Sequence, residues 1–187
     1  FTVTGGSADS TVAPDSYGGG LYSLSAPVTV RNCEFHNCHS YESGGGIFVQ
    51  YGGASTIQNC VFHNNRANRG GAVLVHWNDT SIEDCTFYQN TSDFHGGAIY
   101  LYDSAQPVRR CVFYENYSGI SSAAIVCTRG SDAIIQNCIF HDNSAASQGQ
   151  VFGTSDSSNP TMTNCVLYNN GGGPSSIISV ITSSDVT

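Results

Sequence analysis

The chain has 187 residues, and 40% of them are hydrophobic, which is enough apolar material for the core of one folded domain. Its formal net charge is −8, and it contains six arginines and no lysine. Because nucleic acids are bound mainly by clustered basic residues, this composition argues against a nucleic-acid partner. No apolar run is long enough to cross a membrane, so membrane insertion is not expected.

Two short phrases recur along the chain in phase with each other. The first joins a pair of small residues to an apolar segment, and it returns every 26 residues. Its copies occupy residues 19–22, 45–48, 71–74, 97–100, 123–126, 149–152 and, in weaker form, 175–178. The second phrase is built around a cysteine, and successive copies are 25 to 27 residues apart. Its cysteines are Cys33, Cys60, Cys85, Cys111, Cys138 and Cys165. A fixed period of this size is typical of a solenoid.

Each repeat contains three short segments in which apolar and polar residues alternate. In the second repeat, Ile47 and Val49 follow the small pair, Ile57 precedes the cysteine by three residues, and Cys60 alternates with Phe62. Short alternating runs cut by Gly, Asn, Asp and Ser predict strands and turns. We therefore predict an all-β parallel β-helix of about seven coils of about 26 residues, with three short strands per coil.

Stacking of the coils places equivalent residues above one another, so that the cysteines form an inward column. A column of asparagines follows the cysteines by five residues. Its members are Asn65, Asn90, Asn116, Asn143 and Asn170, with Cys38 in the first repeat. Such side chains are expected to bond to one another along the axis as an asparagine ladder. A second turn column precedes the cysteines, and Arg110 interrupts its series of Asn and Asp, which predicts a different turn geometry there.

The eight cysteines have two interpretations. Cysteine-rich secreted chains often carry disulfides, but six of these residues lie in a core column, where cysteine acts as a small hydrophobe. In-register parallel neighbours seldom have the side-chain vectors that a disulfide requires. Free buried thiols are the favoured interpretation, and Cys38 and Cys127, which lie off the column, are the candidate exceptions.

The motifs Gly-Gly-Ala-Val (70–73), Gly-Gly-Ala-Ile (96–99) and Phe-x-x-Asn (62–65, 87–90, 113–116, 140–143) carry a family resemblance. They resemble the repeats of the chlamydial polymorphic outer-membrane proteins, and more broadly the right-handed parallel β-helix repeats of secreted and cell-surface proteins. The resemblance implies a right-handed coil and a surface-displayed adhesin passenger. We expect residues 1–187 to form a single repeat array within a longer protein.

The chain shows no pattern that predicts catalytic residues, a cofactor or a metal site. Cys33 and His36 lie close in sequence, but they should point to opposite faces of one strand and so cannot share an ion. The enzymes among β-helix proteins surround a groove with long loops that carry carboxylates, whereas the turns here are short and uniform. An enzyme is therefore not expected.

The outward side of the strand after the small pair predicts an interaction surface. Because Ile47 and Val49 face inward, Phe48 should face outward. The equivalent residues form an apolar and aromatic stripe, which contains Tyr22, Phe48, Leu74, Tyr100, Val126, Phe152 and Ile178. Exposed apolar stripes mark interaction surfaces, so we expect protein–protein packing or self-assembly here, with glycans as the alternative partner.

Asn78 begins the sequon Asn78-Asp79-Thr80 and is the candidate glycosylation site, since it lies in a turn beside Trp77. The leading hypothesis from the sequence is a non-catalytic structural or adhesive module, located outside the cell or on its surface. The alternative is a carbohydrate-binding or polysaccharide-cleaving β-helix domain.

Overall fold

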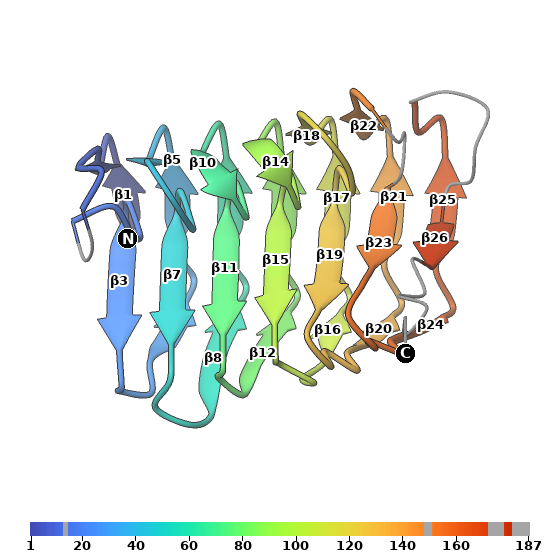
Figure 1. Ribbon diagram of the computed structural model, residues 1–187, viewed down its shortest axis with the longest axis horizontal. Helices are drawn as coiled ribbons and strands as arrows, with labels where there is room; N and C mark the ends of the chain where they lie inside the picture. The colour runs from blue at the N-terminus through green and yellow to red at the C-terminus, as the bar shows by residue number, and fades with distance from the viewer. Residues whose placement is uncertain (13–14, 148–150, 172–177, 181–187) are drawn as a thin grey trace, which may run out of the picture.

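The computed structural model describes residues 1–12, 15–147 and 151–171, together with the backbone of Ile178–Val180 (Figure 1). These residues form strands and turns without a helix. The small-residue phrases at 149–150 and 175–177 lie outside the described residues.

The chain winds into a coil whose parallel strands form four sheets, named A to D in this article. Sheet A contains β1 (Thr2–Thr4), β5 (Glu34–His36), β9 (Val61–His63), β13 (Thr86–Tyr88), β17 (Val112–Tyr114), β21 (Ile139–His141) and β25 (Val166–Tyr168). Sheet B contains β2 (Ser7–Ala8), β6 (His39–Ser40), β10 (Arg66–Arg69), β14 (Thr91–His95), β18 (Tyr117–Ser118) and β22 (Ser144–Ala145). Sheet C contains β3 (Leu21–Leu24), β7 (Ile47–Gln50), β11 (Val73–His76), β15 (Ile99–Tyr102), β19 (Ile125–Thr128), β23 (Phe152–Thr154) and β26 (Ile178–Val180). Sheet D contains β4 (Thr29–Arg31), β8 (Ser55–Gln58), β12 (Thr80–Glu83), β16 (Val108–Arg109), β20 (Ile134–Gln136) and β24 (Thr161–Thr163).

The parallel β-helix predicted from the sequence is confirmed, with two differences in detail. Each coil has four strands where three were expected, because the strands of sheet B are short and largely polar, as in His39–Ser40, and show no apolar alternation. Sheets A and C have seven strands each, so six steps separate their end strands and the chain completes about six turns. In Figure 1 the strands of sheet C lie side by side in chain order along the long axis.

The corners between sheets are made by residues with a left-handed backbone. The corner from D to A uses Asn32, Asn59, Asp84, Arg110, Asn137 and Asn164. The corner from A to B uses Asn37, Asn64, Gln89, Glu115, Asp142 and Asn169. The corner from B to C uses Gly18, Gly44, Gly70, Gly96 and Ser122. The corner from C to D uses Ser25, Tyr51, Trp77, Asp103, Arg129 and Asp156. Asn and Gly reach this region at low cost, which explains the recurrence of Asn at the D–A and A–B corners and of Gly at the B–C corner.

Arg110 does not change its corner, contrary to the expectation from the sequence. Its φ of 53° matches the 55° of Asp84 one coil earlier. Its guanidinium donates hydrogen bonds of 2.6 Å and 2.9 Å to the Asp84 carboxylate and one of 2.7 Å to Glu83. The same contacts lower the pKa of the half-buried Asp84 carboxyl, with the Arg110 hydrogen bond as the main cause. The corner geometry is therefore set by the coil, and arginine adopts it.

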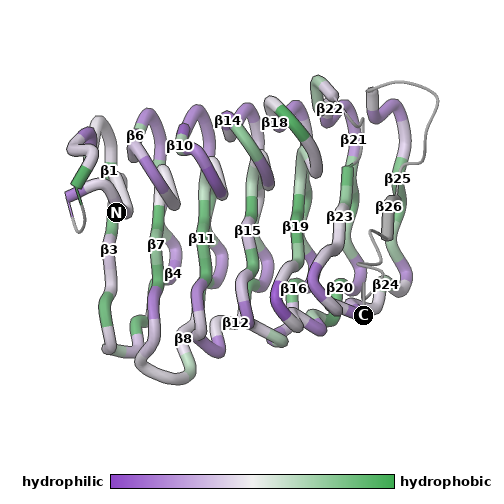
Figure 2. The backbone as a smooth tube through the Cα atoms, in the orientation of Figure 1, coloured by the Kyte–Doolittle hydropathy of each residue, from purple (hydrophilic) through white to green (hydrophobic). Residues whose placement is uncertain are grey.

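The interior is filled by stacked columns of equivalent residues. In the phenylalanine column the rings of Phe87 and Phe113 lie 4.9 Å apart and those of Phe113 and Phe140 4.8 Å apart, nearly parallel in both cases. Cys111 and Ile135 are examples of the buried cysteine and anchor columns beside it. A single coil would leave the upper and lower sides of these inward side chains exposed to water, so their burial depends on the stacking of neighbouring coils. Figure 2 shows hydrophobic residues in the centres of β7, β11 and β19.

The asparagine ladder is confirmed at the A–B corner. The Asn90 side chain donates from Nδ2 to the Asn116 Oδ1 atom at 3.0 Å and to the Phe62 carbonyl at 2.9 Å. The Asn116 Oδ1 atom also accepts the backbone N–H of Asn90 at 3.1 Å. The ladder residues are not the left-handed ones at this corner. That conformation belongs to the preceding residue of each coil, such as Asn64 before Asn65.

The register of sheet C changes at its sixth strand. From β3 to β19, paired residues of neighbouring strands are 26 positions apart in the sequence. Between β19 and β23 the interval is 27, because Ile125 pairs with Phe152 and Val126 with Gly153. Phe152 therefore points into the core, where it is 3% exposed, and is not part of the outward stripe. The backbone of Ile178 pairs with that of Phe152, and its side chain lies outside the described part of the structure. Because this coil is one residue longer than the earlier ones, Phe152 lies in the interior and Gly153 takes the outward position.

All eight cysteines are free thiols, including Cys38 and Cys127. Cys38 takes the first position of the asparagine ladder, where its N–H donates to the Asn65 Oδ1 atom at 3.0 Å. Cys127 is fully buried in sheet C beside Leu101. Burial is the main cause that raises the pKa of the Cys111 and Cys127 thiols.

We expect these thiols to be inert while the protein is folded. Because the thiolate is the reactive form, Cys111 and Cys127 should not react with an aromatic disulfide reagent at about pH 8 in buffer. Under denaturing, non-reducing conditions the same reagent should count eight thiols. A lower count in the denatured protein would reveal a disulfide and contradict the free-thiol structure.

Candidate functional site

The outward column of sheet C forms the floor of a groove. Five residues of the stripe take the outward positions predicted for them. They are Tyr22, Phe48, Leu74, Tyr100 and Val126. They do not form an exposed apolar surface, however. Phe48 is 3%, Leu74 5% and Val126 7% exposed, while Tyr22 and Tyr100 are partly exposed. The expected exposure of the stripe is therefore corrected, because neighbouring columns cover these side chains.

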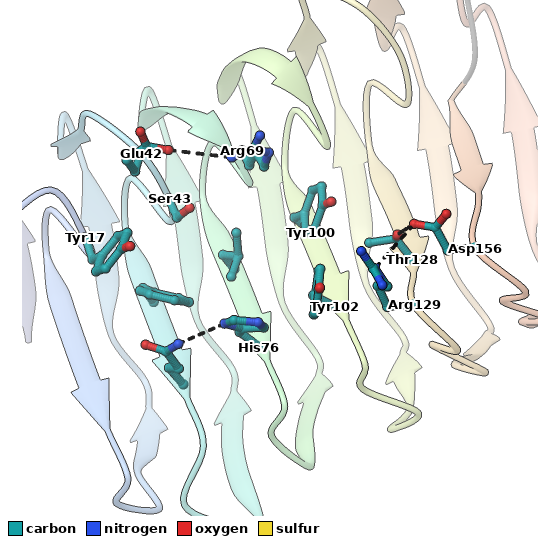
Figure 3. Close-up of a pocket in the computed structure, with 13 residues that line it drawn as sticks. Tyr17, Glu42, Ser43, Arg69, His76, Tyr100, Tyr102, Thr128, Arg129 and Asp156 are labelled. Atoms are coloured by element: carbon teal, nitrogen blue, oxygen red, sulfur yellow. Dashed lines mark hydrogen bonds and ion pairs between the residues drawn. The ribbon is translucent and has the colours of Figure 1, made fainter. Parts of the chain in front are cut away.

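One side of the groove is a column that immediately precedes the B–C corner, and we call it the wall column. Its members, Tyr17, Ser43, Arg69, His95 and Ser121, pair with one another from coil to coil. The Tyr17 ring packs edge-on against Phe48 with centroids 5.0 Å apart, which helps to bury that side chain. In Figure 3, Tyr17, Ser43 and Arg69 follow this wall in coil order.

The opposite side is formed by the next outward column of sheet C and by the C–D corner. The Tyr22 hydroxyl donates to the Gln50 Oε1 atom at 3.1 Å, and the Gln50 Nε2 atom lies 3.0 Å from the His76 Nδ1 atom. The His76 ring stacks on Trp77 at 4.3 Å and meets Tyr102 edge-on at 4.5 Å. Trp77 remains 44% exposed, so this side ends in an aromatic cluster open to solvent.

Three adjoining depressions make up the groove. The first, of about 410 Å³, lies above Phe48, Leu74 and Tyr100 (Figure 3). The second, of about 450 Å³, lies beside Trp77 and Tyr102. The third, of about 350 Å³, lies between the wall column and Thr128. Asp156 lines all three, Arg129 lines the first and second, and Arg69 lines the first and third. The groove therefore continues along the helix axis over successive coils.

Charges of both signs line the groove and are largely paired. An Arg69 terminal nitrogen lies 3.6 Å from the Glu42 carboxylate. Asp156 accepts a hydrogen bond from the Thr128 hydroxyl at 2.8 Å and lies 3.9 Å from Arg129 (Figure 3). Burial lowers the pKa of His76, and burial together with the positive charge of Arg69 lowers the pKa of His95. Both imidazoles are therefore neutral at pH 7.

The Asn78 side chain does not fit the role of a glycosylation site. It is 3% exposed, and its amide donates to the Tyr51 carbonyl while its Oδ1 atom accepts the Thr80 hydroxyl at 2.7 Å. These bonds hold the C–D turn together. The expectation that Asn78 is freely available is therefore wrong.

A family model described as a right-handed β-helix region matches residues 20–187. The chain belongs to the right-handed β-helix family. No curated protein and no solved structure is significantly similar to it. The match bears out the right-handed parallel coil, while the closer resemblance to the chlamydial repeats is not confirmed.

The outer face of sheet A in this β-helix carries a second aromatic column. Its rings stack almost parallel, with the centroids of neighbouring rings 4.6 to 5.1 Å apart. The members of the column are His36, His63, Tyr88, Tyr114, His141 and Tyr168. Neighbouring rings therefore cover one another's faces, while Tyr168 at the end of the described column is 47% exposed.

Among the residues that the structure describes, no group of three or more His, Cys, Asp and Glu side chains is arranged to hold a metal ion. Within the same ranges, no helix is long and apolar enough to cross a membrane.

The residues that sequence reasoning missed are those of the wall column. They occupy residues 17, 43, 69, 95 and 121, each directly before the left-handed residue of the B–C corner. The constant interval of 26 residues was visible, but the residue types differ, so no pattern marked them. Their common position in the right-handed β-helix is what brings them over the stripe.

Proposed function

We propose that this chain is a non-catalytic adhesive module of an extracellular or cell-surface protein, and that it binds a linear glycan in the groove over sheet C. The observation that carries the proposal is the groove itself, which follows the helix axis and combines aromatic rings with polar side chains. Ligand sites in proteins typically combine apolar walls with a few placed polar groups.

The two sides of the groove offer the two kinds of contact that a sugar chain uses. Trp77 and Tyr102 present amphipathic aromatic surface on one side. Ser43, His95 and Ser121 present polar groups on the other. Because coils repeat at about the 4.8 Å strand spacing, a chain lying along the axis meets the next residue of each side at every coil. A linear polymer of similar units suits such a surface better than a compact ligand.

The arrangement of carboxylates supports binding without cleavage. Glycoside hydrolases use two carboxyl groups that flank the scissile bond. Here Glu42 faces Arg69 on the wall side, while Asp103 accepts the Trp77 indole N–H at 2.6 Å on the opposite edge. Each carboxylate is thus engaged in holding a neighbouring side chain.

The location and the adhesive role rest on composition and on resemblance. The acidic chain without lysine, rich in Ser, Thr, Asn and Gly, suits a protein outside the cell. The Gly-Gly-Ala and Phe-x-x-Asn motifs resemble the chlamydial polymorphic repeats, which implies an adhesin passenger. Protein–protein packing through the stripe stays a prediction, and the burial of Phe48 and Leu74 favours a ligand that enters the groove.

Changes at the exposed aromatic cluster are expected to weaken glycan binding. In Tyr102→Thr the ring is replaced by the residue that the next coil has in this column, and in Trp77→Asn by a residue suited to the left-handed corner. Affinity for the best ligand on a glycan array, measured by calorimetry, should fall by about tenfold or more in each variant, because stacking area is lost.

Tyr117→Thr is the matched control, since Tyr117 is exposed on sheet B and pairs there with Thr91. Its affinity should equal that of the unchanged protein. Equal losses in all three variants would argue against the groove. Release of reducing ends or unsaturated products from a bound glycan would show an enzyme and overturn the non-catalytic proposal.

A further inference from the structure

The wall of the groove contains an irregularity that the regular coil does not require. Strands β10 and β14 pair at Ala67 with Ser92 and again at Arg69 with His95, so β14 has one extra residue between the two pairs. This β-bulge pushes Phe94 outward, where it is 39% exposed. Bulges often re-aim side chains next to functional sites.

The bulge supports Arg69. The guanidinium carbon of Arg69 lies 5.9 Å from the centroid of the Phe94 ring, a cation–π contact that holds the side chain over the wall. Asp93, the other residue of the bulge, is occupied by Arg66 through hydrogen bonds of 3.2 Å and 2.8 Å. Among the residues that the structure describes, the remaining charged partner of Arg69 is Glu42 at 3.6 Å, and a partly exposed pair at this distance is weak. An anion that enters the groove can therefore displace the Glu42 carboxylate from Arg69.

His95 faces the same space as Arg69. Its Nδ1 atom lies 2.9 Å from the Ser121 hydroxyl, and among the described residues no hydrogen bond to its Nε2 atom is formed. The depression between these side chains is also lined by Tyr100, Ser122 and Thr128. Asp156 stands at its far side, where Arg129 and the Thr128 hydroxyl bind its carboxylate.

We propose that Arg69 and His95 form a subsite for an anionic substituent, a carboxylate or a sulfate group, of the glycan bound in the groove. This inference rests on the proposed function and names the class of glycan. Arginine presents a planar fork of donors that matches carboxylate and sulfate oxygens, and the free imidazole nitrogen adds a further donor. The Ser121 hydroxyl, 2.9 Å from the His95 Nδ1 atom, orients the imidazole ring.

The subsite should respond to pH. Burial and, after it, the positive charge of Arg69 lower the pKa of His95, and a bound anion would oppose the effect of Arg69. Binding of the anion therefore favours protonation of His95, so affinity should rise as pH falls below the ordinary histidine value of 6.5. The other titratable side chains that face this space are Glu42, Asp156 and Tyr100.

The test uses one glycan backbone in four forms. The probes are a chondroitin sulfate hexasaccharide, its desulfated form, its carboxyl-reduced form and the form with both changes. Calorimetry with the unchanged protein should show the anionic forms binding about tenfold more tightly than the neutral form, the effect of charge-assisted hydrogen bonds. The two singly modified forms show whether carboxylate or sulfate is recognised.

Arg69→Gln should remove this preference while leaving affinity for the neutral form within about twofold. Arg69→Lys should keep part of the preference, because the charge remains but the fork is lost. Arg66→Gln is the matched control on the outer side of the same strand and should keep the preference. His95→Gln should abolish the rise in affinity at low pH.

The outcomes separate the inference from the proposed function. If no form binds the unchanged protein, the proposed function fails and the inference fails with it. If all four forms bind equally, or if Arg69→Gln weakens the neutral form as much as the anionic ones, only the anionic subsite is overturned. The His95 resonance supplies a test without glycan, because Arg69→Gln should raise the pKa of His95. An unchanged pKa would contradict the placement of the two side chains.

Discussion

Replacing Asn116 by alanine is expected to destabilise the protein by at least about 3 kcal/mol, because several buried polar groups lose their partners at once. The Asn116 side chain is fully buried and donates to the Phe87 carbonyl and to Asn143, each at 2.9 Å. It also accepts from the backbone and side-chain nitrogens of Asn90. Urea unfolding followed by far-ultraviolet circular dichroism measures the loss.

Asn159→Ala is the control for this experiment, since Asn159 is exposed in the segment that precedes β24. Its free energy of unfolding should stay within about 0.5 kcal/mol of that of the unchanged protein, as for most surface substitutions. Asn116→Asp should be nearly as damaging as Asn116→Ala, because a carboxylate cannot donate to Phe87 and would be buried as a charge. A small effect of both Asn116 variants would mean that water or a local shift replaces the ladder bonds.

Phe113→Ala is the second change for which a large effect is expected. Phe113 is fully buried, and its ring lies between those of Phe87 and Phe140. Removing it leaves a cavity in the middle of the column, which costs about 3–5 kcal/mol in free energy of unfolding. The same denaturation measurement detects it, and a large shift in the thermal midpoint should accompany it.

Two comparisons sharpen that result. Phe113→Leu, which introduces the residue that β25 carries in this column, should cost clearly less because most of the volume is kept. Phe94→Ala, at the exposed bulge, should hardly change stability. If Phe94→Ala proved as destabilising as Phe113→Ala, the assignment of the inner and outer columns would be wrong.

The cysteine, phenylalanine and asparagine columns could be predicted because each coil repeats the same residue at the same position. Cys60, Phe62 and Asn65 recur one period apart, and stacking in a parallel coil then follows from strand geometry. The strands of sheet B could not be predicted in this way. They contain only a few residues, of mixed polarity, and are held by backbone pairing between coils that leaves no alternation in the sequence.

The groove shows where prediction from the sequence stopped. Alternation correctly placed Phe48 and Tyr100 on the outside of sheet C. It could not show that Tyr17 packs on Phe48, because that contact joins a residue beside the corner of one coil to a strand residue of the next coil. The prediction from a strict interval of 26 also placed Phe152 on the outside of the sheet. The structure buries it, because the free energy gained by removing a phenylalanine from water favours a coil that is one residue longer.

The sequence by itself determined the repeat, the parallel β-helix and the inward columns, because these depend on local alternation and on one period. The tertiary structure alone decided which outward residues are exposed and which charges meet. Arg69, Phe94 and His95 come together through a one-residue bulge between neighbouring coils. Such a contact depends on the register of pairing across coils, which a single strand's pattern does not contain.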